Sequence, residues 1–198
     1  GATHESAIFE MNEKGLTHVE NPSEIFLSER ALSASGSVVI PIMEGTRPIL
    51  IEVQGLVSPA TYGNPQRNAT GFDMRRLSML LAILDKRLGY QMGTQDVFVN
   101  IVGGLRVDEP SLDLAVVSAI ASSNRDMPIK ATTVICGEVG LSGEVRSISH
   151  LDRRVSEAEK LGFKKIVCPI QNLKKFKHKT SIELIGVATV QEALEYIL

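Results

Sequence analysis

The chain has 198 residues, of which 43% are hydrophobic, and this length and composition can bury one substantial core. Its formal net charge is −2 at pH 7, which excludes the strong overall positive charge of many nucleic-acid-binding proteins, so any DNA contact needs a local basic patch. There is no run of about 18 apolar residues and no signal-peptide pattern, so we expect a cytoplasmic protein without a membrane partner. The sequence starts with Gly1 and not with methionine, and we expect it to be a fragment of a longer protein.

The two cysteines, Cys136 and Cys168, lie inside apolar segments and do not form a Cys-x-x-Cys pair. This placement argues against a zinc site and indicates structural core thiols in a reducing compartment. We therefore assign no metal ligands to this chain.

The first 60 residues divide into a polar leading segment and a predicted hairpin. Residues 1–35 are mixed and polar, with a turn signal at Asn21 and Pro22 and a short helix expected after Ser23. From Gly36 onward, "SVVIPIM" and "PILIEVQ" are β-branched runs separated by "EGTR", which predicts two paired strands. The following segment 57–71 is rich in Gly, Pro and Asn and predicts a long exposed loop.

After this loop the pattern alternates between helices and strands. Residues 72–89 place Leu77, Leu80 and Leu84 at three- and four-residue steps and end at Gly89, which predicts an amphipathic helix. Residues 109–123 are apolar on almost every side, which predicts a largely buried helix. The other expected elements are strands at 96–102, 132–139, 164–170 and 181–187, helices from Leu151 to Gly162 and at 190–198, and a basic connector at 172–179. Because helices and strands interleave without a linker, we expect one α/β or α+β domain.

Ser111, in the segment "VDEPSLDLAVVSAI" (107–120), stands where the buried helix should begin. Asp108 can cap this helix and Pro110 suits its first turn, so Ser111 would lie among free backbone N–H groups able to stabilise an oxyanion. A nucleophilic serine also needs a base within reach. The alternative interpretation, which we favour from the residues alone, is a serine tolerated in a first helical turn.

"DEPS" followed by a small-residue helix, then "GEVGLSGEVRSISHLDRR" and "AEKLGFKKIVCP", resembles the proteolytic domain of Lon-type ATP-dependent proteases. That resemblance places the family's nucleophile on Ser111 and its lysine base on Asp152. A carboxylate cannot replace a neutral amine that must accept the serine proton, so the resemblance implies a degenerate site without catalytic residues. Glu109 and Asp113 stand where the proteases have glycines, and both would repel an oxyanion.

Two further functions stay open at this stage. A serine peptidase with a rearranged base would have to use His150, although a histidine at a helix entrance is more often a surface or capping residue. A pure oligomerisation module without DNA contact is the other alternative.

Longer sequence segments extend the resemblance, which then runs from about residue 6 to the C-terminus. "SEIFLSER", "GSVVIPIMEGTRPILIEVQGLV", "GFDMRRLSMLLAILDKRLG" and "DVFVNIVGGLRVDEPSLDLAV" look like the C-terminal Lon-like domain of the RadA (Sms) family of bacterial DNA repair and recombination proteins. This resemblance implies a ribosomal-protein-S5-like α/β fold at residues 36–198, with residues 1–35 following an ATPase domain outside this sequence.

The same resemblance implies a noncatalytic domain of a helicase that drives branch migration. From the resemblance we expect three kinds of partner: further copies of the chain in a homohexameric ring, single-stranded or branched DNA, and a recombinase. The chain contains no P-loop and no paired Cys-x-x-Cys, so ATP, Mg and Zn are expected only in the domains outside it, and no cofactor is expected here.

Basic residues around the helix 72–89 are the leading DNA-facing candidates. Arg75 and Lys86 are eleven residues apart, as are Arg76 and Arg87, and eleven helical steps return to nearly the same side. Arg67 in the preceding loop can add a phosphate contact. A solvated helix flank is the equal alternative. We interpret a second cluster as a plain exposed connector; it consists of Lys174, Lys175, Lys177 and Lys179.

Overall fold

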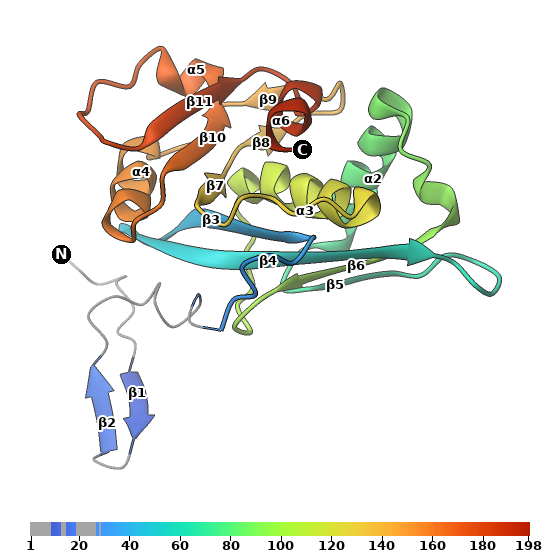
Figure 1. The fold of residues 1–198 in the computed structure, drawn as a ribbon, viewed down its shortest axis with the longest axis horizontal. Helices are drawn as coiled ribbons and strands as arrows, with labels where there is room; N and C mark the ends of the chain where they lie inside the picture. The colour runs from blue at the N-terminus through green and yellow to red at the C-terminus, as the bar shows by residue number, and fades with distance from the viewer. Residues whose placement is uncertain (1–8, 13–14, 19–26, 28) are drawn as a thin grey trace.

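The computed structural model describes residues 9–12, 15–18, 27 and 29–198. In this part of the chain a seven-stranded sheet forms the centre, with the strand order β11-β10-β7-β3-β4-β6-β5. Four of its six strand pairs are parallel, and the pairs β3–β4 and β4–β6 are antiparallel. The protein therefore has the α/β architecture expected from the sequence (Figure 1).

The strands differ widely in length. The central sheet consists of β3 (Ser37–Glu44), β4 (Arg47–Pro59), β5 (Arg67–Thr70), β6 (Gln95–Ile101), β7 (Thr133–Ile135), β10 (Lys165–Pro169) and β11 (Glu183–Val187). Two separate hairpins consist of β1 (Phe9–Asn12) with β2 (Gly15–His18) and of β8 (Glu138–Val139) with β9 (Val145–Arg146).

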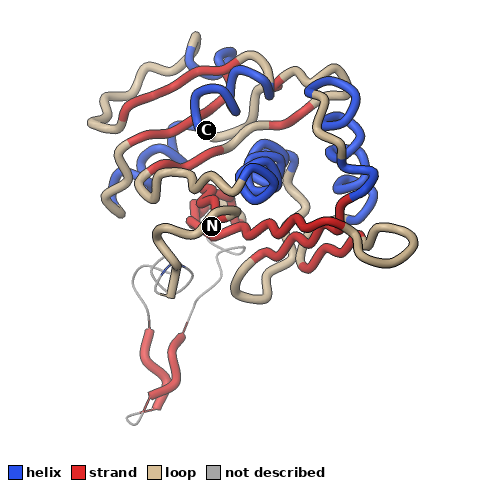
Figure 2. Tube along the Cα trace, turned by 45° about the vertical axis from the view of Figure 1, so that its right-hand side comes forward, coloured by secondary structure: helices blue, strands red, loops and turns tan. Residues whose placement is uncertain are grey.

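Helices lie against the middle strands of this sheet and near both of its ends. They are α2 (Met74–Leu88), α3 (Asp113–Arg125), α4 (Leu151–Lys160), α5 (Ile170–Leu173) and α6 (Val190–Ile197), with 3₁₀ turns η1 (Met92–Thr94) and η2 (Pro110–Leu112). Figure 1 shows α3 lying along β3 and β4, with α6 and the C-terminus above it. In Figure 2 the same helix is seen nearly end-on between the two ends of the twisted sheet. None of the helices in the described ranges is long and apolar enough to cross a membrane.

The close packing of α3 on the sheet depends on small residues. The helix is buried from Asp113 to Ser122, as its apolar composition predicts. A Cβ atom added to Gly55 of β4 would lie 3.0 Å from the backbone of Ala119, so only glycine lets this strand approach the helix so closely. Cys136 and Cys168 are free and buried, which confirms them as core thiols, and burial raises the pKa of Cys136 to about 12.

The predicted hairpin is confirmed, and its strands β3 and β4 pair from Ser37↔Gln54 to Glu44↔Arg47. The predicted helices 72–89 and 151–162 are confirmed as α2, ended by Gly89 in the left-handed region, and α4, followed by Gly162. The helix expected after Ser23 lies largely outside the described residues.

Two sequence expectations were wrong in part. The segment 57–71 is not one long loop, because β4 continues to Pro59 and β5 adds a parallel edge strand along β6. This strand is stabilised by its neighbour and not by its own apolar content. The strand expected at 132–139 ends at Ile135. The chain leaves the sheet there, and Gly137 exchanges backbone hydrogen bonds with the residues around the start of α3.

Candidate functional site

Ser111 lies in the 3₁₀ turn η2, directly before α3, and the residue is only 2% exposed. Asp108 does not cap this turn, because its carboxylate pairs instead with Arg106 at 3.2 Å. The expectation of free backbone N–H groups was also wrong. The N–H groups of residues 112, 113 and 114 already donate to the carbonyl oxygens of Glu109, Pro110 and Gly137, so they are not available to an oxyanion.

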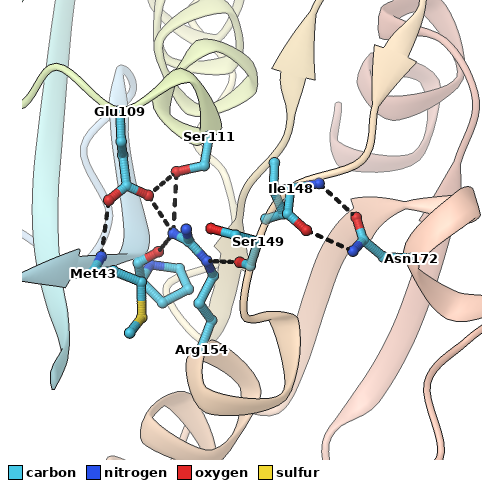
Figure 3. A network of polar contacts seen from close by, with 8 residues as sticks. Met43, Glu109, Ser111, Ile148, Ser149, Arg154 and Asn172 are labelled. Carbon is cyan, nitrogen blue, oxygen red and sulfur yellow. Dashed lines mark hydrogen bonds and ion pairs between the residues drawn. The ribbon is translucent and has the colours of Figure 1, made fainter. Parts of the chain in front are cut away.

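A buried arginine holds the surroundings of Ser111 together (Figure 3). Arg154 of α4 is 2% exposed. Its Nε donates to the carbonyl of Ser149 and its Nη1 to the carbonyl of Pro41, both at 2.8 Å. The same Nη1 donates to Ser111 Oγ at 3.1 Å and forms an ion pair with Glu109. One guanidinium thus joins α4, β3 and the segment that carries Ser111.

The hydroxyl of Ser111 is already used as a donor. Ser111 Oγ donates to Glu109 Oε1, and the other carboxylate oxygen of Glu109 accepts from the backbone N–H of Met43 at 2.9 Å. On the opposite wall, the amide of Asn172 bonds both the N–H and the carbonyl of Ile148 and so fixes the segment before α4. Met43, Glu109, Ser111, Ile148 and Arg154 border a pocket of about 250 Å³.

Neither candidate base reaches Ser111. The carboxylate of Asp152 lies 3.6 Å from His178 Nε2, on the side of α4 that faces away from the pocket lining. His150 is exposed, adopts a left-handed backbone conformation (φ 55°) and makes no side-chain capping bond. Within the described ranges, no group of three or more His, Cys, Asp or Glu side chains is placed to hold a metal ion.

Asp113 is paired and does not act as a free carboxylate near Ser111. It is fully buried, forms a bidentate ion pair with Arg76 of α2, and accepts from the N–H of Val139 in β8 at 3.1 Å. Burial raises the pKa of Asp113, and the hydrogen bonds from Arg76 and Val139 oppose this shift. The hydrogen bond to Asp113 in turn raises the pKa of Arg76. The charge of Asp113 therefore joins α2, α3 and β8.

The five DNA-facing candidates do not share one free surface. Arg67 donates to the backbone carbonyls of residues 92 and 95, and Arg76 is committed to Asp113, so both guanidinium groups serve the fold. Arg75, Lys86 and Arg87 are exposed on α2, and Arg87 Nε makes a 3.3 Å hydrogen bond to the carbonyl of Leu141.

The sequence reasoning missed Arg154, although the sequence carries a signal for it. In α4 the buried residues Leu151, Arg154, Val155 and Ala158 follow the three- and four-residue steps of an inward helical face. An arginine on such a face must find buried acceptors, since a buried charge without partners is very costly. Arg76 has the same signal, because it stands four residues before the buried Leu80.

Replacing Arg154 with Met should lower the free energy of unfolding by about 3–5 kcal/mol, because Glu109 loses its counter-ion and the carbonyls of Ser149 and Pro41 lose a donor. The matched control Arg153→Met, at an exposed neighbour, should change it by no more than about 0.5 kcal/mol. Urea unfolding measures both. The double variant Glu109→Gln/Arg154→Met should be more stable than Arg154→Met; equal losses for Arg153 and Arg154 would contradict this account.

Replacing Arg76 with Met should cost about 3 kcal/mol at pH 7, because Asp113 stays buried without its counter-ion. In this variant the folded-state pKa of Asp113 rises further above its unfolded value. Stability is then retained at low pH and lost as the pH rises through the folded pKa, so the deficit should shrink on acidification. Urea unfolding across a pH series, with Arg75→Met as the exposed control, tests this. A deficit independent of pH would refute the assignment.

Comparison with known proteins identifies a family for this chain. A family model described as subunit ChlI of Mg-chelatase matches residues 54–172, more than half of the chain and the part that contains both Ser111 and Arg154.

Relatives named "DNA repair protein RadA" match along the whole chain. The identity is 52% with the protein of Halalkalibacterium halodurans, over 100% of this chain and 43% of that protein. It is 53% with the protein of Bacillus subtilis, over 98% of this chain and 42% of that protein, and 48% with the protein of Listeria monocytogenes, over 100% and 43%. The chain thus spans less than half the length of these relatives. It belongs to the family described as subunit ChlI of Mg-chelatase, and along its length it is similar to part of the RadA proteins.

Proposed function

We propose that this chain is a noncatalytic, Lon-like scaffold domain of a RadA-type DNA repair protein, which supports a ring of six subunits and contacts DNA. Identity of about half of all residues with proteins named for DNA repair supports this role. In the proposal, residues 36–198 form an S5-like domain and residues 1–35 follow an ATPase domain.

The whole protein is then a cytoplasmic, ATP-driven hexameric helicase. It acts in branch migration during homologous recombination, together with a recombinase. ATP and Mg belong to its ATPase domain and Zn to an N-terminal finger, so the present chain holds none of them. Its contribution is to position subunits and DNA.

The observation that carries the noncatalytic role is the occupied hydroxyl of Ser111. A nucleophilic serine must transfer its proton to a base that is unprotonated before reaction. Here the hydroxyl donates to Glu109, whose carboxylate is itself paired with Arg154. A guanidinium cannot accept a proton, and a carboxylate in an ion pair is a weak base. The neighbouring backbone N–H groups are engaged as well. This arrangement favours a structural serine.

The DNA contact rests on the exposed cations of α2. Arg75 and Lys86 are exposed near opposite ends of the helix, and neither is within ion-pair distance of a carboxylate in the described part of the chain. Long basic side chains of this kind bind phosphates without reading the base sequence. We therefore propose weak, salt-dependent binding.

Ser111 should not react with a fluorophosphonate probe, and the chain should not cleave unstructured peptides, because no base activates the hydroxyl. Ser111→Ala should retain the assembly state and DNA affinity of the wild type and lose about 1 kcal/mol of stability with its hydrogen bonds. Mass spectrometry after labelling measures the first outcome. Labelling of the wild type and not of Ser111→Ala would instead favour the peptidase with a rearranged base.

The DNA affinity of the chain, measured across a salt series with its mass determined on the same sample, tests the scaffold role. Arg75→Glu/Lys86→Glu should weaken binding, and removing two single-strand phosphate contacts should lower the salt slope by about 1.4. The control Arg125→Glu/Lys130→Glu carries the same charge change at exposed positions at and after the end of α3. A hexamer that binds no DNA would support the pure oligomerisation module.

A further inference from the structure

The segment between α5 and β11 is the densest run of unpaired cations in the described part of the chain. Its four lysines are all exposed, and none lies within ion-pair distance of a carboxylate there; they are Lys174, Lys175, Lys177 and Lys179. By contrast, Arg67 and Arg76 use their guanidinium groups within the fold. These lysines therefore form a second group of free cations, in addition to those exposed on α2.

This segment is fixed at both ends. Phe176 is partly buried and packs against the core, and the N–H groups of residues 174, 175 and 176 donate to carbonyls of α5. At the other end, the N–H and the hydroxyl of Ser181 both donate to Glu159 Oε1 at 2.6 Å. A segment tied in this way loses less conformational entropy when a ligand binds than a free loop does.

The outer side of α4 borders these lysines and adds one further cation, Arg153. A groove of about 290 Å³ lies between α4 and the segment, and it is lined by Arg153, Ser156, His178, Lys179 and Thr180 together with two carboxylates. Those carboxylates are engaged, Asp152 with His178 and Glu159 with Ser181. Arg153 donates to the backbone carbonyl of Thr46, and no carboxylate in the described part of the chain forms an ion pair with it.

We propose that the surface formed by residues 174–180 and the outer side of α4, here called the α4 basic surface, binds the phosphate backbone of a nucleic acid. This inference rests on the proposed DNA-related function and adds a second contact region, separate from α2. Lysines with hydroxyl neighbours suit phosphate oxygens. The large hydrophobic side chains that are exposed in the described chain lie elsewhere, and a folded protein partner would need such anchors.

The test compares two double variants of the full chain that remove equal charge. Lys175→Gln/Lys179→Gln changes the α4 basic surface, and Arg125→Gln/Lys130→Gln changes exposed positions at and after the end of α3. Affinity for a labelled oligothymidine is measured by anisotropy across a salt series, with circular dichroism as the check of folding. We expect the first variant to bind on the order of tenfold more weakly at about 50 mM salt, with a salt slope lower by about 1.4. The control should match the wild type.

The outcomes separate this inference from the function on which it rests. If the wild type binds and both variants bind equally well, the α4 basic surface is rejected while the scaffold role stands. If the wild type binds no oligonucleotide at low salt, both proposals fail. A third outcome is that polyglutamate of equal charge binds as tightly as the oligonucleotide and that the same variant abolishes this binding. The surface would then recognise acidic protein, and the nucleic-acid assignment would be overturned.

Discussion

The burial of one guanidinium group organises the centre of this protein. Arg154 is enclosed where α4, β3 and η2 meet, and a buried cation is tolerated only when every nearby acceptor is placed to receive it. Two carbonyls, one hydroxyl and one carboxylate meet that condition. Because these acceptors come from distant parts of the chain, the ion pair with Glu109 forms only when the whole fold is assembled.

A second buried pair works in the same way on the other side of η2. Asp113 joins α2 to α3 and β8 through Arg76 and Val139. Each of the two acidic residues that flank Ser111 thus has its own arginine, and the repulsion that the sequence alone suggested between these acids and an oxyanion is replaced by structural pairing. The region around Ser111 has the layout of an active site, but its polar groups form hydrogen bonds and ion pairs that hold helices and strands together.

In the described part of the chain, the packed interior and the charged surface have different roles. The sheet and α3 form the inner part, where Gly55 lets helix and strand approach closely. The outer part carries lysines and arginines that the fold does not use, on α2 and between α5 and β11. A chain with a net charge of −2 can still present positive surfaces, because its charges are unevenly distributed and four exposed lysines cluster between α5 and β11.

The sequence by itself determined the hairpin β3–β4, the helix α2 and the buried helix α3, because alternation, helical spacing and closing glycines such as Gly89 are local signals. It also located the segment around Ser111. The tertiary structure alone decided that β5 is a strand, since its order comes from pairing with β6. It likewise decided which charges are free: Arg76 and Arg154 look like surface residues by type, and only long-range packing brings their acceptors within hydrogen-bonding distance.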